Sequence, residues 1–272
     1  MAGGAAMTVT ALSIAGSDPS GGAGIQADLK SFSANGAYGM CVITALTAQS
    51  TLGVTGVHAV PVDFVRAQLD TLLDDIAPDA TKIGMLATAG LARAVGDYLP
   101  RLTGTVLDPV MVATSGDALL DEDAVDEVRR LCTVAELITP NLPETAVLLG
   151  ADPATGIDEL VDQARALRGL GVRRALVKGG HLDEEATDVY VDEDGPVLLR
   201  GRRIDTGNTH GTGCTLSSAI AALRPRHDGW LGAVRAAKAY LNDAIAAADA
   251  LGVGHGHGPV HHFHAYWPQE DR

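Results

Sequence analysis

The chain has 272 residues, of which 46% are hydrophobic, and it carries a formal net charge of −14. So acidic a surface repels nucleic acid and anionic membranes, and no apolar run approaches the roughly 18 residues of a membrane span. The three cysteines lie far apart and form no Cys-x-x-Cys pair, which favours a reducing cytoplasm.

Short β-prone runs alternate with helical periods along most of the chain. Strands are predicted at 8–16, 39–49, 81–84, 104–111, 135–139 and 174–180. Amphipathic stretches at 62–76 and 123–132 place their apolar residues on one helical face. This βαβα order predicts an α/β protein with a mostly parallel sheet that helices cover on both sides.

The pattern changes near the end of the chain. Residues 188–204 are typical of a hairpin that turns at Asp194-Gly195, and helices are predicted over 210–224 and 229–249. No linker, repeat or low-complexity tract divides the sequence. We therefore expect one domain over residues 8–272, after a flexible leader over residues 1–7 that lacks the features of a signal peptide.

Two glycine motifs bear on nucleotide binding. The stretch GAGIQA (22–27) matches the dinucleotide-binding pattern, which also needs an acidic residue about 20 positions further on to hold a ribose. No Asp or Glu lies between Asp28 and Asp63, so the glycines serve another ligand or a tight turn. A Walker A loop is excluded because the dipeptide Gly-Lys is absent from the chain.

The stretch NTHGTGC (208–214) leads directly into an alanine-rich helix. The backbone N–H groups of Gly211, Thr212 and Gly213 and the positive end of that helix converge on one point, which suits an anion such as phosphate. Cys214 lies there, where a helix start is expected to lower the pKa of its thiol. It fits a proton acceptor, a nucleophile, a metal ligand or a small packing residue. A Cys-x5-Arg phosphatase is excluded because the arginine is missing.

The tail GHGHGPVHHFH (254–264) holds five histidines in eleven residues. Neither a carboxylate nor a cysteine lies among them, and their spacing is loose for a metal site. An ordered tail punctuated by glycines is favoured over metal binding.

Eight segments together resemble the ribokinase-like superfamily and, within it, the bacterial hydroxymethylpyrimidine/phosphomethylpyrimidine kinases of thiamin biosynthesis. They are 15–39, 42–51, 81–86, 107–120, 138–150, 176–182, 208–223 and 254–267. The resemblance runs from about Thr8 to Trp267, and several of the motifs are long and specific.

The resemblance implies a three-layer α/β/α sandwich. It also implies that the protein is cytoplasmic and forms a homodimer. It implies transfer of the γ-phosphoryl group of ATP, with Mg²⁺, to the alcohol of 4-amino-5-hydroxymethyl-2-methylpyrimidine and then to the monophosphate. A pyridoxal kinase on the same fold and a non-catalytic ligand-binding relative are the alternatives.

The resemblance also assigns the phosphate end of the site. Cys214 would accept the proton of the attacking oxygen, at a position where sugar-kinase relatives carry aspartate, while the Gly211–Gly213 loop would cradle the migrating phosphoryl group. Asn141 and Glu144 match an Asn-x-x-Glu motif associated with Mg²⁺ and the phosphates. Asp108 would hold the metal through water, and Lys178 would neutralise the nucleotide.

At the pyrimidine end, the resemblance suggests Gln49, Asp28 and Met85. An amide such as that of Gln49 donates to and accepts from an aminopyrimidine edge, and Met85 would pack on the ring. One position departs from the family, whose members often carry a basic residue just before NTHGTGC. Gly207 stands there in this chain, and a weaker second phosphorylation is the expected consequence.

Overall fold

The computed structural model describes residues 8–111, 124–180, 182 and 186–267. The expected leader over residues 1–7 lies outside these residues, as does part of the matching segment 107–120. None of the described helices is long and apolar enough to cross a membrane.

A large sheet runs through the described part of the molecule, with its eight strands in the order β10-β9-β8-β7-β6-β5-β1-β2. The strands are β1 (Thr10–Ala15), β2 (Tyr38–Ile43), β5 (Ala80–Ile83), β6 (Thr105–Leu107), β7 (Leu137–Ile138), β8 (Ala175–Val177), β9 (Asp188–Asp192) and β10 (Gly195–Leu199). All pairs from β2 to β8 are parallel, and only β9 and β10 run antiparallel to their neighbours. The predicted mostly parallel sheet is confirmed.

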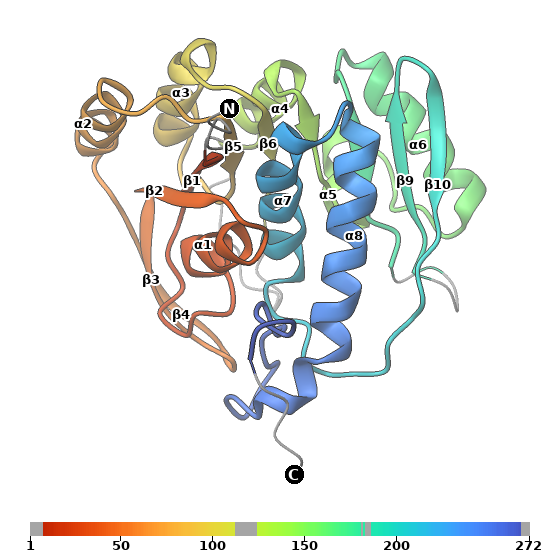
Figure 1. Ribbon diagram of the computed structural model, residues 1–272. Helices are drawn as coiled ribbons and strands as arrows, with labels where there is room; N and C mark the ends of the chain where they lie inside the picture. The colour runs from red at the N-terminus through yellow and green to blue at the C-terminus, as the bar shows by residue number, and fades with distance from the viewer. Residues whose placement is uncertain (1–7, 112–123, 181, 183–185, 268–272) are drawn as a thin grey trace, which may run out of the picture.

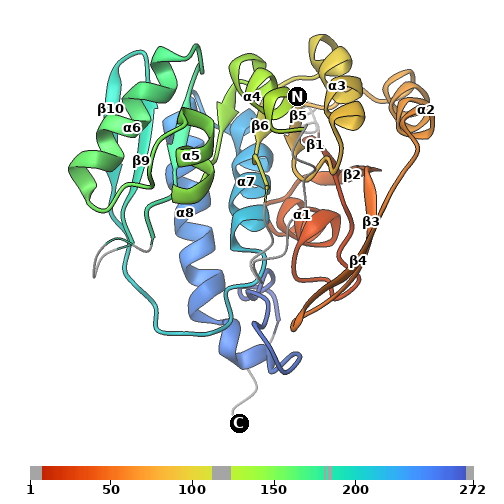
Figure 2. The ribbon, with the colours of Figure 1, turned by 180° about the vertical axis from the view of Figure 1, so that it is seen from behind.

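Helices cover both faces of this sheet (Figures 1 and 2). One layer contains α1 (Gly24–Ala34), α7 (Thr212–Leu223) and α8 (Trp230–Ala246), and the other contains α2 (Val62–Leu73), α3 (Ala89–Tyr98), α4 (Val125–Val134), α5 (Leu142–Leu149) and α6 (Ile157–Gly169). Short 3-10 helices span Leu99–Arg101, Arg224–Arg226 and Ala248–Leu251. Successive residues of β1 enter opposite cores, Ala11 on the α7 side and Leu12 on the α3 side. This period of two is what a strand covered on both faces requires.

The predicted strand over 39–49 is wrong in one respect, because two strands occupy that region. The chain leaves the sheet at Thr44, whose N–H donates to the Ala15 carbonyl at 3.0 Å and whose Oγ1 donates to the Met85 carbonyl at 2.7 Å. Beyond it, β3 (Ala45–Ser50) pairs antiparallel with β4 (Gly53–Ala59) as a separate two-stranded sheet. This hairpin projects from one end of the molecule (Figure 1).

The predicted hairpin near the end of the chain is confirmed, in shorter form. β9 and β10 pair antiparallel, and Gly195 has φ 105°, a left-handed value that glycine adopts without strain. The predicted helices over 210–224 and 229–249 correspond to α7 and α8.

Candidate active site

A cavity of about 1160 Å³ lies at the carboxyl edge of the parallel strands. Asp108, Asn141 and Lys178 line it. Asp108 directly follows β6, Lys178 directly follows β8, and Asn141 lies just beyond the end of β7. Open α/β sheets bind ligands at this edge. All but one of the residues that the sequence suggested for the site line this cavity: Gln49, Met85, Asp108, Asn141, Glu144, Lys178, Gly211, Thr212, Gly213 and Cys214.

The glycine loop before α7 approaches another backbone segment very closely. Gly211 has φ 78°, and a Cβ built on it would lie 1.8 Å from the carbonyl oxygen of Gly22. The N-cap of α7 is Gly211, which has no side chain to cap the helix, so its own side chain does not compete for the first N–H groups. The helix start is therefore available to an anion in the cavity.

Asp108 and Lys178 form an ion pair against this helix start. The Lys178 ammonium donates to Asp108 Oδ1 at 3.0 Å, and Thr139 Oγ1 donates to the same oxygen at 3.0 Å. A Cβ on Gly213 would lie 3.2 Å from Lys178 Nζ, so the absence of a side chain lets the lysine approach. Burial lowers the pKa of Lys178, but Asp108 and Glu144 outweigh it, so the pKa is raised and the lysine stays charged.

Asn141 and Glu144 have a second task besides lining the cavity, because they form the capping box of α5. Asn141 Oδ1 accepts from the Glu144 N–H at 2.9 Å, and the Glu144 carboxylate accepts from the Asn141 N–H at 2.8 Å. Burial raises the pKa of Glu144 to about 7, against the lowering effect of Lys178. The spacing Asn-x-x-Glu thus places both polar groups at a helix start on the cavity wall.

The thiol of Cys214 does not have the low pKa that a helix start alone would give. Burial raises its pKa to about 11, and the nearby Lys82 cation lowers it only in part, while the carboxylates of Asp28 and Asp108 raise it. The expectation of a lowered thiol pKa is therefore wrong. Desolvation and the two carboxylates outweigh the helix start, and in the free protein the group is a neutral thiol at pH 7.

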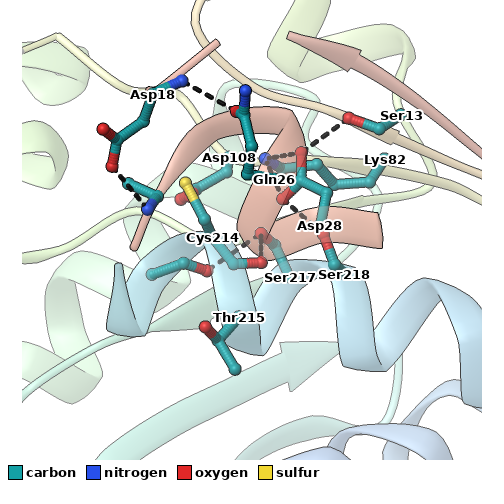
Figure 3. Close-up of polar contacts among 12 residues, drawn as sticks. Ser13, Asp18, Gln26, Asp28, Lys82, Asp108, Cys214, Thr215, Ser217 and Ser218 are labelled. Atoms are coloured by element: carbon teal, nitrogen blue, oxygen red, sulfur yellow. Dashed lines mark hydrogen bonds and ion pairs between the residues drawn. The ribbon is translucent and has the colours of Figure 1, made fainter. Parts of the chain in front are cut away.

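Asp28 is the one suggested site residue that does not line the cavity, which corrects its assignment as a substrate contact. Its side chain is fully buried behind the cavity wall, between α1, β5 and α7 (Figure 3). Lys82 donates to both of its carboxylate oxygens at 2.8 Å, and Ser218 Oγ donates to Oδ1 at 2.7 Å.

The sequence analysis did not single out several cavity residues, among them Asp18, Lys82 and His210. His210 Nε2 lies 2.8 Å from Asp18 Oδ2, and this contact joins the loop before α1 to the loop before α7. Burial raises the pKa of Asp18, but hydrogen bonds from His210, Ser20 and Ala23 outweigh it and leave the pKa at about 2. Asp18 and His210 lie within motifs noted above, but their pairing spans 192 positions and leaves no local signal.

Gln49 and Met85 line the same cavity as Lys178. Gln49 follows an irregularity in β3, and its Oε1 accepts from Thr47 Oγ1 at 3.2 Å. Met85 is nearly buried, and a Cβ on Gly16 would lie 2.5 Å from its Cε. The glycine therefore lets the methionine reach the wall that it shares with Gln49.

The tail histidines bind other parts of the protein. His262 Nε2 lies 3.0 Å from Thr215 Oγ1, and burial lowers the pKa of His262 to about 3. His257 lines the cavity, and its N–H donates to the Thr51 carbonyl at 3.0 Å. Within the described residues, no group of three or more His, Cys, Asp or Glu side chains is arranged to hold a metal ion.

The three-layer fold, with a cavity at the carboxyl edge of its parallel strands, is that of a small-molecule kinase of the ribokinase-like class. A family model described as phosphomethylpyrimidine kinase matches residues 18–261. The chain belongs to that family. It is 55% identical over 263 residues to the hydroxymethylpyrimidine/phosphomethylpyrimidine kinase of Escherichia coli, with 95% of this chain and 99% of that protein covered. The protein of the same name from Rhizobium meliloti is 53% identical, covering 96% and 99%.

Solved structures agree with the family and widen the comparison. An ADP complex of pyridoxal kinase from Bacillus subtilis superposes with a TM-score of 0.88 at 34% identity, covering 96% of this chain and all of that one. The phosphomethylpyrimidine kinase of Clostridium difficile gives a TM-score of 0.78 at 38% identity, covering 88% and 100%.

Proposed function

We propose that this protein transfers the γ-phosphoryl group of ATP to the alcohol of 4-amino-5-hydroxymethyl-2-methylpyrimidine and then to the resulting monophosphate, as a step of thiamin biosynthesis. The observation that carries the proposal is the cavity at the sheet edge, where an uncapped helix start lies against an Asp–Lys pair. Relatives that carry the name of both phosphorylations match nearly their full length, which supports it.

In this proposal the phosphates lie at the start of α7. The N–H groups of the Gly211–Gly213 loop bind the migrating phosphoryl group, and Lys178 neutralises the nucleotide's charge. Phosphoryl transfer passes through a loose transition state with little covalent work for the protein, so positioning and charge supply most of the rate.

The residues present fit a magnesium ion that arrives with the nucleotide. Mg²⁺ takes oxygen ligands, keeps several waters and is usually bound by one or two carboxylates together with substrate phosphates. Asp108 and Glu144 provide two carboxylates on one cavity wall, beside Asn141. Bound there with ATP, the ion would offset charge on the phosphates, with Asp108 acting through water.

Cys214 is proposed to accept the proton of the attacking oxygen, and Gln49 and Met85 to bind the pyrimidine by its amino edge and its ring. A loose transition state needs little deprotonation of the nucleophile early on, so a weak base is sufficient. A thiol that is neutral at pH 7 accepts no proton, however. The role therefore requires that groups around Cys214 stabilise its thiolate.

Pyridoxal kinase is a second candidate function, and the superposition on the pyridoxal kinase of Bacillus subtilis favours keeping it. In both substrates the phosphoryl acceptor is a hydroxymethyl group on a nitrogen heteroaromatic ring. A non-catalytic relative is the third possibility, but it leaves the Asp108–Lys178 pair and the uncapped helix start without a use.

The assembly and location that we propose are a homodimer in the cytoplasm. The β3–β4 hairpin and the adjacent β2 and α2 expose large apolar side chains, at Tyr38, Leu46, Leu52, Val57 and Phe64. Exposed large apolar side chains of this kind are available to an interface between two copies of the chain. The described cysteines are free, as in a reducing compartment.

The test is phosphorus NMR of the products after incubation with excess MgATP and either the pyrimidine alcohol or pyridoxal. Successive monophosphate and diphosphate signals from the pyrimidine, abolished by excess chelator, are expected. Pyridoxal phosphate as the sole product would transfer the assignment to the second candidate, and no turnover of either alcohol would favour a binding protein. A diphosphate signal much weaker than the monophosphate signal would agree with the departure at Gly207.

A further inference from the structure

A fully buried ion pair lies directly behind the proposed reaction centre. Lys82, on β5, donates to both carboxylate oxygens of Asp28, on α1, and both side chains are 0% exposed. Ser13 on β1 and Ser218 on α7 also donate to this carboxylate, at 2.6 and 2.7 Å. Three elements besides α1 therefore hold Asp28 in one position (Figure 3).

This pair is joined to Cys214 through α7. Ser218 follows Cys214 by four residues, so their side chains lie on the same face of the helix. Lys82 and Cys214 both line the cavity, and the Gly24 N–H at the start of α1 forms a hydrogen bond to the thiol. Lys82 and Asp28 lie close enough to the sulfur to act on its charge, and neither side chain is exposed to solvent.

The charges around Cys214 come from four elements. Burial is the largest influence on its thiol pKa, and next comes the Lys82 cation, which lowers the pKa, followed by Asp28 and Asp108, which raise it. Lys178 also interacts with the sulfur, but it is bound to Asp108. Although burial disfavours its charge, the pKa of Lys82 is raised by Asp28, Cys214 and Asp108, so the lysine remains a cation.

Stability alone does not account for this pair, because replacing a buried ion pair by apolar packing is often neutral or stabilising. We propose that Lys82 and Asp28 are positioning residues that set the charge of Cys214: Lys82 stabilises the thiolate that accepts the substrate proton, and Asp28 limits that stabilisation and fixes Lys82 in place. The inference rests on the proposed role of Cys214, and it gives the pair opposite effects on one atom.

The experiment measures the pH dependence of Cys214 alkylation by iodoacetamide, with the modified peptide quantified by mass spectrometry so that Cys41 and Cys132 do not contribute. Lys82→Met should raise the thiol pKa by about one unit or more, and Asp28→Asn should lower it. The double variant removes both charges, and because Lys82 has the larger influence its thiol pKa should lie between those of the wild type and Lys82→Met. Ser218→Ala, which removes an uncharged donor to the same carboxylate, is the matched control and should leave the thiol pKa unchanged.

If the pair had a merely structural role, both single substitutions would shift the thiol pKa of Cys214 in the same direction or leave it unchanged. Either result would overturn the proposal. Each single variant strands a buried charge and is destabilised, so the double variant, which strands none, provides the test if neither single variant folds. A double variant with an unchanged or lowered thiol pKa would overturn the inference. Alkylation needs no turnover, so it measures the thiol pKa independently of catalysis. If the pKa values fall in the expected order but kcat does not follow them, Cys214 is refuted as the proton acceptor, while the effect of the pair on the thiol still holds.

Discussion

Gly211→Ala is the substitution that most directly tests the phosphate-binding loop. At this position φ is 78°, and a Cβ would lie 1.8 Å from the Gly22 carbonyl oxygen and 2.8 Å from its carbon. The left-handed conformation alone costs an alanine about 1–2 kcal/mol. Since the obstacle is backbone rather than a flexible side chain, the loop must also move by more than 1 Å, because real Cβ contacts begin at 3.0 Å.

The expected result is a fall in kcat/KM for MgATP of about 10²-fold, because a misplacement of about 1 Å in a catalytic site costs roughly that much. The strain should also lower the Tm by roughly 2–8 °C. Steady-state kinetics with the pyrimidine alcohol, together with thermal unfolding, measure both effects.

Gly207→Ala is the matched control, because Gly207 also lines the cavity but a Cβ there meets nothing within 4 Å. It should retain the activity and the Tm of the wild type. With the first phosphorylation as the readout, a Gly211→Ala protein with unchanged kcat/KM for MgATP, or an equal loss in both variants, would refute the assignment of the helix start to the phosphates.

Three further predictions concern single side chains. Gln49→Ala should raise the KM for the pyrimidine alcohol by about 5- to 150-fold, the loss of one buried hydrogen-bonding partner, and leave the KM for ATP unchanged; an unchanged pyrimidine KM removes Gln49 from the site. Cys214→Ala should lower kcat by about 10²- to 10⁴-fold and keep measurable transfer, as loss of a general base does, whereas complete loss together with an isolable phosphocysteine in the wild type would indicate a covalent mechanism. Asp18 has a pKa lowered to about 2, so its contribution of about 2 kcal/mol to the free energy of unfolding is complete above pH 4 and lost as the pH falls to 2. Urea unfolding of Asp18→Asn and the wild type should therefore differ by about that amount at pH 6 and converge near pH 2, and a difference independent of pH would contradict a contribution from the Asp18 carboxylate.

The fold could be predicted because its signals are local. Alternating strands and amphipathic helices imply a parallel sheet, and residues that follow parallel strands, such as Asp108 and Lys178, must meet at one edge. The turn at Thr44 could not be predicted in this way. Its hydrogen bonds go to Ala15 and Met85, distant residues that only the folded chain brings near.

The electrostatics of the site could not be predicted from the sequence, for a similar reason. Asp28 belongs to a motif that the family resemblance marks, yet its partner Lys82 lies 54 positions away and the two meet only across the folded core. The thiol pKa of Cys214 depends on this pair and on burial, and a helix start, which the sequence does reveal, is only one contribution among them.

Part of the site is built by residues late in the described chain, through the contact between His210 and Asp18 and through the contacts of residues 255–262. The cavity wall includes Gly16 and Asp18, which follow β1, and His257, which is synthesised after every strand of the described sheet. The backbone of His210 also pairs with that of Pro259 in an isolated β-bridge, and His262 contacts Thr215 in α7. A nascent chain that has assembled the whole sheet therefore still lacks part of the site, and contacts of such long sequence separation form slowly. We therefore expect activity to appear only after residues 255–262 have been synthesised and packed, later than the folding of the sheet.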